Sequence, residues 1–288
     1  MTLLRTVPIR RLSRADLTRC LDLSADRGRP ADDRSWQLLL TAGAGHGIDD
    51  PDGDGLIGSY VLTRYGPELA CMSRLLVAER HARRGLGRRL MAHALEEAGG
   101  TPVLGYATDL ARPLYEHHGF TAVTRSTTYA GRFRPESGAS GPSEESDATR
   151  PAAAADLPAV LRLDAEVFGS DRMQLLTRLP AFADRFRVAE DRRGLTGFAA
   201  AWRSADDTVI GPVVAGNTTT ARRLIADLAG PTEGAVRLDV DDRHTELAAW
   251  LADRGVAPVT ASTVMVHGAA GLPGDHGRRF APLMVALG

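Results

Sequence analysis

The stretch from Leu75 to Leu90 has the residue types of an anion-binding site. It reads LLVAERHARRGLGRRL: an apolar run, a basic turn with two glycines, and the start of a helix. Gly85 and Gly87 leave room for a phosphate beside the backbone, and the first N–H groups of a helix carry the positive end of its dipole. The guanidinium groups of Arg83, Arg84 and Arg88 add positive charge. A diphosphate site is therefore predicted; the alternative is a strand–helix turn with solvated arginines.

Two further segments belong with this loop. Leu75-Leu76-Val77 ends the preceding apolar strand, where free backbone groups could bond an extended ligand arm. The predicted helix Asp109–His117 carries Leu114-Tyr115-Glu116 and is followed by Gly119-Phe120. The Gly85-Leu86-Gly87 turn and the LYEHHGF segment together resemble the GNAT superfamily of acyl-CoA-dependent N-acyltransferases. The family signatures are Gln/Arg-x-x-Gly-x-Gly/Ala and Leu-Tyr-Glu-x-x-Gly-Phe.

This resemblance covers about the first 130 residues and has two departures. Ala82 stands where the first signature has Gln or Arg, and Thr108 stands where the family often has Asn. The resemblance implies that acetyl-CoA is bound by Leu76, Val77, Arg83, Arg84, Gly85, Leu86, Gly87 and Arg88. It also implies that Tyr115 protonates the departing thiolate after an amine attacks the thioester directly; otherwise Tyr115 is a core aromatic. The general base that would accept a proton from the amine is left open between Glu68 and Ser73, with neither preferred.

The chain of 288 residues repeats itself. Three echoes occur in the same order in both halves: Arg10–Leu17 with Arg150–Leu157, Arg88–Leu90 with Arg222–Leu224, and Gly119–Thr127 with Gly255–Thr263. We infer a tandem duplication, with an N-terminal GNAT domain over 1–134, a Pro-, Gly- and Ser-rich linker over 135–147, and a divergent GNAT-like domain over 148–288.

The expected fold class is α/β (an α+β mixed sheet), built twice. In the first half we expect strands at Val7–Leu12, Leu56–Arg64, Leu69–Val77, Pro102–Tyr106 and Phe120–Tyr129, and helices at Arg14–Ala25, Asp33–Thr41, Leu86–Glu97 and Asp109–His117. In the second half we expect helices at Ala155–Phe168, Arg172–Leu179, Thr219–Ala229 and His244–Ala252, and strands at Arg185–Ala189, Leu195–Trp202, Thr208–Val214, Ala235–Val240 and Ala257–His267.

The second half lacks the candidate cofactor residues. In alignment with the first half, Gly85–Gly87 fall on Thr219–Ala221, and Tyr115 falls on Leu251. The block Ile210–Ala215 and the late segment Val264–Gly268 resemble a divergent GNAT subgroup. We expect a pseudo-catalytic half that shapes the acceptor pocket or docks the first half; an independent second active site is the alternative.

Net charge, cysteine content and the length of apolar runs limit the classes of function to consider. A net charge of −1 gives no argument for nucleic acid. The two cysteines and the absence of a signal-like start or a long apolar run favour a cytoplasmic protein with no membrane partner. No metal is expected: the calcium-loop-like segment that starts with Asp50–Ile57 lacks the glutamate that ends such a loop, and His117-His118 point apart on a helix. Asp239, Asp241, Asp242 and His244 could line a cationic acceptor site but more often mark a solvated strand end.

We therefore expect an N-acetyltransferase that moves an acetyl group from acetyl-CoA to a primary amine of a small molecule or peptide, with a homodimer possible. The alternatives are a non-catalytic acyl-CoA sensor or scaffold, and a tandem synthase for a thiol such as mycothiol. The resemblance leaves the acceptor and the acyl chain length open.

Overall fold

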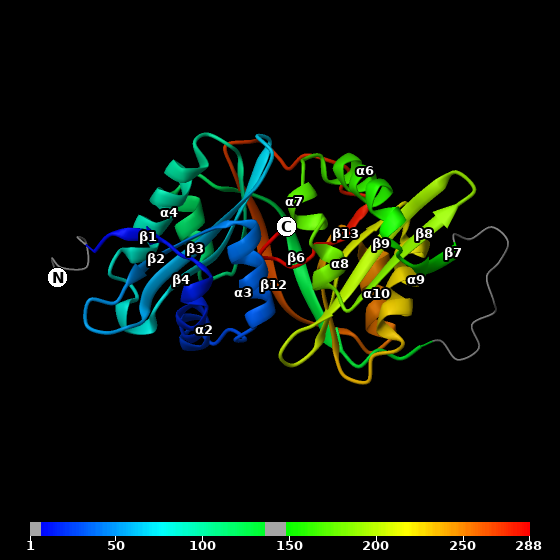
Figure 1. The fold of residues 1–288 in the computed structure, drawn as a ribbon, viewed down its shortest axis with the longest axis horizontal. Helices are drawn as coiled ribbons and strands as arrows, with labels where there is room; N and C mark the ends of the chain where they lie inside the picture. Colours follow the sequence, from blue (N-terminus) through cyan, green and yellow to red (C-terminus); the bar gives the residue numbers. More distant parts are fainter. Residues whose placement is uncertain (1–6, 136–147) are drawn as a thin grey trace. The chain divides into compact units, whose positions relative to one another are not determined.

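The computed structural model describes residues 7–135 and 148–288, in which the chain forms two compact units. The linker expected over 135–147 lies outside the described residues except for Pro135. Unit 1 contains the described part of Met1–Val123 together with Val264–Leu272 and Ala286–Gly288; unit 2 contains Thr124–Thr263 and Pro273–Val285. Each unit thus takes in segments that are far apart in the sequence (Figure 1). The ranges 1–134 and 148–288 remain predictions about the two sequence copies.

Unit 1 is a mixed sheet with helices on both faces. Its strands β1 to β5 are neighbours in sequence order, and only the β4–β5 pair is parallel. The elements are β1 Ile9–Arg11, η1 Arg14–Asp16, α2 Leu17–Asp26, α3 Asp33–Ala42, β2 Ala44–Asp49, β3 Leu56–Tyr65, β4 Leu69–Val77, η2 Glu79–His81, α4 Leu86–Ala98, β5 Val103–Ala107 and α5 Arg112–His117. Helix α4 packs Leu90, Met91 and Ala94 into a core with Tyr60, Leu62 and Met72 of the sheet.

Unit 2 repeats this plan. Its strands follow the order β6-β11-β10-β9-β8-β7, and β10–β11 is the parallel pair. The elements are β6 Thr121–Gly131, β7 Ala148–Pro151, η3 Ala154–Asp156, α6 Leu157–Phe168, α7 Met173–Leu176, α8 Leu179–Phe182, β8 Arg185–Asp191, β9 Gly194–Arg203, β10 Thr208–Ala215, α9 Thr218–Ala229, β11 Val236–Asp241, α10 Thr245–Asp253, β12 Ala257–His267 and β13 Arg279–Ala281. Strands β6 and β12 each begin in one unit and end in the other.

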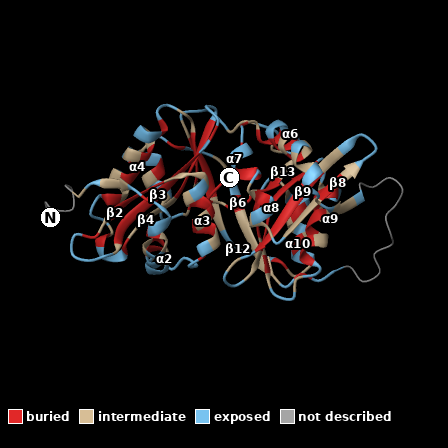
Figure 2. Ribbon diagram, viewed as in Figure 1, coloured by how far each residue is buried: buried red, intermediate tan, exposed pale blue. Residues whose placement is uncertain are grey.

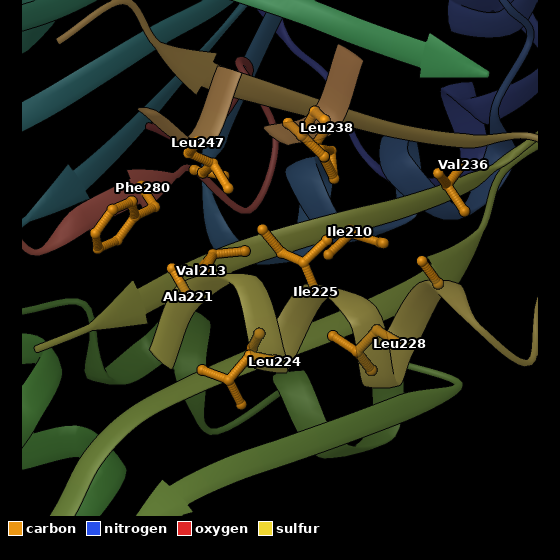
Figure 3. Packing of buried hydrophobic residues seen from close by; sticks show 14 of the residues in the cluster. Ile210, Val213, Ala221, Leu224, Ile225, Leu228, Val236, Leu238, Leu247 and Phe280 are labelled. Atoms are coloured by element: carbon orange, nitrogen blue, oxygen red, sulfur yellow. The ribbon is translucent and has the colours of Figure 1, made fainter. Parts of the chain in front are cut away.

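In both units the buried residues lie along the strands and on the helix faces turned toward them (Figure 2). The unit 2 core joins Leu224, Ile225 and Leu228 of α9 to Ile210 and Val213 of β10 (Figure 3). These helices bury one face because their apolar residues recur at three- and four-residue intervals.

The sequence echoes correspond to matching structural features. Arg10 donates to Asp16 at 2.7 Å and to Asp49 at 2.6 Å, and Arg150 donates to Asp156 at 2.6 Å and to Glu190 at 2.9 Å. The first echo therefore preserves an arginine that joins a short helix to the second strand of each unit. The last echo preserves a left-handed glycine after a helix, with φ of 80° at Gly119 and 82° at Gly255.

The fold departs from the sequence expectation in a few elements. Strands β2, β7 and β13 were not expected; β7 and β13 are four and three residues long, too short for a periodic pattern to stand out. Helix α5 begins at Arg112 rather than Asp109 because the turn closed on the Thr108 carbonyl is interrupted at Pro113, which has no N–H to continue it. The helix expected over Arg172–Leu179 is two single turns, α7 and α8.

Candidate functional site

The N-terminus of α4 is the candidate anion site. Gly85 is its N-cap with φ of 84°, a left-handed conformation that favours glycine, and the helix has no side-chain cap. Arg83, two residues earlier, also has a positive φ of 60°. Left-handed residues in such a turn help to point backbone N–H groups toward one side. No side chain among the described residues occupies the first amides of α4, and the anion-binding role expected for this turn stays a prediction.

The arginines around this turn divide into two groups. Arg80 forms an ion pair with Asp50, and Arg89 donates to the carbonyl of Val7. Arg83, Arg84 and Arg88 are exposed, and within residues 7–135 and 148–288 no carboxylate lies within ion-pair distance of them. These three guanidinium groups can therefore turn to a bound phosphate without first breaking an ion pair.

Strand β4 separates from β5 just before this turn. The two strands pair only at Ala70–Val103, Cys71–Leu104 and Met72–Gly105. Leu76 and Val77 pair with β3 on the other edge of β4. The register shifts between Ser59 and Val61, so β4 has one extra residue there, as in a β-bulge; Arg74 lies at this point and has φ of 51°. In the described residues, β5 offers the last part of β4 no partner, so this edge can bond an extended ligand.

Consecutive residues of α5 connect the turn to the sheet. Leu114 approaches Gly87 so closely that a β-carbon there would lie 3.3 Å from its Cδ2 atom. The Tyr115 ring lies on Gly105, where a β-carbon would lie 2.5 Å from its Cε1 atom. The structure thus gives Gly87 a packing reason besides the phosphate approach expected from sequence, and it brings Tyr115 to the point where β4 and β5 part.

Tyr115 is almost completely buried. Its ring meets Phe120 edge to face at a centroid distance of 4.9 Å. Burial raises the pKa of the Tyr115 phenol because the phenolate would lose its hydration, and the nearby Cys71 thiol adds to the shift. The side chain therefore remains a neutral O–H donor at neutral pH. Tyr115 is therefore a core residue, and its role as a proton donor stays a prediction.

The two candidate bases lie at different places on β4. Glu68 is exposed in the turn before β4, at the opposite end from Val77, so its carboxylate is remote from the α4 N-terminus. Ser73 lies one residue after the last β4–β5 pair and is 7% exposed. Its hydroxyl has no hydrogen-bond partner among the described residues. A buried hydroxyl of this kind can hold a water molecule or a ligand amine.

The second copy differs at the equivalent helix. The side chain of Asn217 caps α9 by accepting from the Thr220 amide at 2.9 Å, and α9 carries no basic residue in its first turn. Leu251 of α10, which aligns with Tyr115 in sequence, is also buried. The first turn of α9 thus carries a side-chain cap in place of the basic glycine turn of the first copy.

The weaker sequence signals have structural explanations. Asp50 begins a turn between β2 and β3, where it accepts from the Asp52 amide at 3.0 Å. Asp239, Asp241 and Asp242 accept hydrogen bonds from Thr128, Thr124 and Thr127 of β6. In residues 7–135 and 148–288, no three His, Cys, Asp or Glu side chains are grouped to hold a metal. Every helix in these ranges is too short or too polar to cross a bilayer.

Comparisons with known proteins identify the family of this chain. Two family models, both described as an acetyltransferase (GNAT) domain, match residues 48–122 and 160–281. The uncharacterized N-acetyltransferase YitH of Bacillus subtilis is 27% identical over 226 residues, which is 77% of this chain and 78% of that protein.

Two solved structures share the fold. A candidate acetyltransferase of Pyrococcus horikoshii superposes with a TM-score of 0.78 at 20% identity, over 98% of this chain and 95% of that one. A tandem GNAT protein from the clavulanic acid biosynthesis pathway has a TM-score of 0.62 at 15% identity, over 90% and 98%.

Proposed function

Because this chain belongs to the GNAT acetyltransferase family and carries two of its domains in tandem, we propose that its first copy binds acetyl-CoA and acetylates a primary amine. The observation that carries the proposal is the N-terminus of α4, where the described residues provide neither a side-chain cap nor a carboxylate within ion-pair distance of Arg83, Arg84 and Arg88. A diphosphate needs several N–H donors and a compensating positive charge, and this turn offers both.

The proposed contacts follow the chain from β4 into α4. The backbone of Leu76 and Val77 would bond the pantetheine arm at the edge of β4 that β5 leaves open. The amides of Gly85, Leu86 and Gly87 would face the diphosphate, and the guanidinium groups of Arg83, Arg84 and Arg88 would surround it.

The chemistry is a direct acyl transfer. Acetyl-CoA supplies the acyl group as a thioester, whose carbonyl carbon the amine nitrogen attacks as the carbon–sulfur bond breaks. The Tyr115 O–H would give its proton to the departing sulfur, the amine would lose one proton to solvent or to water held at Ser73, and the phenolate would regain a proton from solvent. A backbone N–H near Val77 would donate to the carbonyl oxygen while it carries negative charge. The acceptor amine belongs to a small molecule or a peptide and would bind at the same end of β4.

Calorimetric titration with acetyl-CoA tests the binding part of the proposal. We expect wild-type protein to bind with a Kd well below millimolar, and Arg84→Gln to weaken binding roughly three- to tenfold, the effect of about one ion pair with a phosphate. Arg192→Gln is the matched control because Arg192 is also exposed, in the β8–β9 turn of unit 2. Equal effects of the two substitutions, or no binding by the wild type, would refute the assigned site.

A screen of amine acceptors tests the catalytic part. Release of free CoA thiol that depends on an added amine supports the transferase. Tight binding of acetyl-CoA with no turnover across primary amines of small molecules and peptides would favour the sensor instead.

A further inference from the structure

In the second copy, as in the first, the two central parallel strands pair over only a few residues and then separate. Its central strands β10 and β11 pair only at Thr208–Val236 and Val209–Arg237. Strand β9 covers the other edge of β10 from Thr208 to Ala215. The edge of β10 beyond Val209 therefore corresponds to the edge of β4 that we assign to the pantetheine arm.

In unit 2 this edge is already occupied by the chain itself. Strand β13 pairs antiparallel with β10 at Val213–Ala281 and Val214–Arg279. The Ala215 amide donates to the carbonyl of Arg278 at 3.1 Å. We propose that segment 278–285 fills the acyl-CoA site of the second copy as a built-in strand, so that the chain binds one acyl-CoA and not two.

Side chains hold the segment in place. Phe280 is 1% exposed and lies in the unit 2 core near Val213 and Leu247 (Figure 3). Its ring stacks on His244 at a centroid distance of 4.1 Å, and Nε2 of His244 lies 2.8 Å from the carbonyl oxygen of Arg279. Burial lowers the pKa of His244, so a neutral ring donates this hydrogen bond from Nε2. A segment anchored in this way is part of the core.

Glycines provide the room that the segment needs. A β-carbon at Gly211 of β10 would lie 2.2 Å from the carbonyl oxygen of Pro282, so the two backbones touch. Gly169 and Gly274 meet in the same manner: a β-carbon on Gly169 would lie 2.4 Å from the Gly274 nitrogen. Because no larger residue fits at these contacts, the sequence of unit 2 is adapted to its own C-terminal segment.

The chain beyond β13 also reaches β11. The buried carboxylate of Asp239 accepts from the Val285 amide and lies 2.5 Å from the Thr128 hydroxyl. Segment 278–285 is thus bonded to both strands that would otherwise part around a ligand. At the N-terminus of α9 the Asn217 side chain accepts from the Thr220 amide, so one of the donors that a diphosphate would use is already bonded.

Hydrogen exchange measured on the full chain without any ligand tests the occupied edge independently of the proposed function. We expect the amides of residues 279–285 to exchange as slowly as those of the unit 2 core. Gly211→Ala should speed their exchange by about tenfold or more, because its β-carbon displaces Pro282. Gly216→Ala is the control, since a β-carbon there has no neighbour nearer than 3.6 Å.

The number of acetyl-CoA molecules per chain completes the test. One equivalent, bound without loss of protection over residues 279–285, supports the inference. Two equivalents, or a loss of that protection on titration, would overturn it while leaving the first site intact. If acetyl-CoA does not bind at all, the proposed function fails and the protection of residues 279–285 still decides whether β13 is an integral strand. Rapid exchange of these amides in the wild type would refute the occupied edge whatever Gly211→Ala does.

Discussion

Comparing Gly85→Ala with Gly100→Ala distinguishes an effect on diphosphate binding from the effect of backbone strain on stability. Gly85 has φ of 84° at the N-terminus of α4, and Gly100 has φ of 87° just after the C-terminus of the same helix. A β-carbon at either position would have nothing within 4 Å. Gly85→Ala and Gly100→Ala therefore impose the same backbone strain at opposite ends of one helix, and only the first lies beside the proposed diphosphate.

The expected magnitudes follow from this geometry. An alanine in the left-handed region costs about 1–2 kcal/mol, so both variants should lose about that much stability. The β-carbon that Gly85→Ala adds would stand in the open space beside the turn, where the diphosphate is proposed to approach the backbone, so at least one amide–phosphate hydrogen bond should be lost. A charge-assisted hydrogen bond is worth roughly 1.5–3 kcal/mol, so acetyl-CoA binding should weaken by about ten- to a hundredfold. Gly100→Ala should change the Kd by less than about twofold.

Two measurements on each variant give the comparison. Thermal unfolding without ligand should show similar decreases of Tm, a few degrees for about 1–2 kcal/mol in domains of this size. Calorimetry with acetyl-CoA should then show weaker binding for Gly85→Ala alone. If both variants bind like the wild type, or if both lose affinity in proportion to stability, the α4 N-terminus does not hold the diphosphate and the assignment is wrong.

Three other substitutions test the remaining parts. Tyr115→Phe keeps the ring and should leave the Kd for acetyl-CoA unchanged while lowering kcat by about 10²–10⁴; wild-type kcat in the variant would contradict the proton donor. Because burial raises the pKa of Tyr115, its ionisation should cause no loss of the wild-type rate below about pH 10. Gly105→Ala should lower kcat by displacing the Tyr115 ring, whereas Gly55→Ala, with open space around it, should not; equal rates would show that the ring position is irrelevant. The hydrogen bond from Arg10 lowers the pKa of Asp16 to about 2, below the unfolded value of about 3.9, so this carboxylate stabilises the fold above about pH 4 and loses the effect as pH falls toward 2. Asp16→Asn should thus cost about 1 kcal/mol at pH 7, after allowance for the partly exposed Arg10, and progressively less below pH 4, measured by urea unfolding.

The elements around the candidate site could be predicted from sequence because their determinants are local. The strand, the glycine turn and the helix are consecutive from Leu69 to Ala98, and each is built by its own neighbours. The sequence could not show which arginines are unpaired. Arg80 and Arg84 look alike in the sequence, but Asp50, 30 positions before Arg80, reaches only the former. The contact roles of Tyr115 and the cofactor loop remain predictions.

The duplication could be recognised from the spacing of repeated residues because those residues form the same contacts in both copies. Arg10 and Asp16 form an ion pair six positions apart, and Arg150 and Asp156 repeat it. Selection on a short-range contact keeps residue type and spacing together, so a sequence comparison detects it. The same reasoning predicts the left-handed Gly119 and Gly255, which end α5 and α10.

The sequence by itself determined the family, the two copies, and the basic turn that distinguishes the first copy from the second. Only the tertiary structure decided that Val264–Leu272 belongs to unit 1 and that Arg279–Ala281 is a strand of unit 2. The physical reason is distance along the chain. A helix or a turn is fixed by residues a few positions apart, whereas the three residues of β13 become a strand only because β10, more than sixty positions earlier, offers an unpaired edge with Gly211 in it.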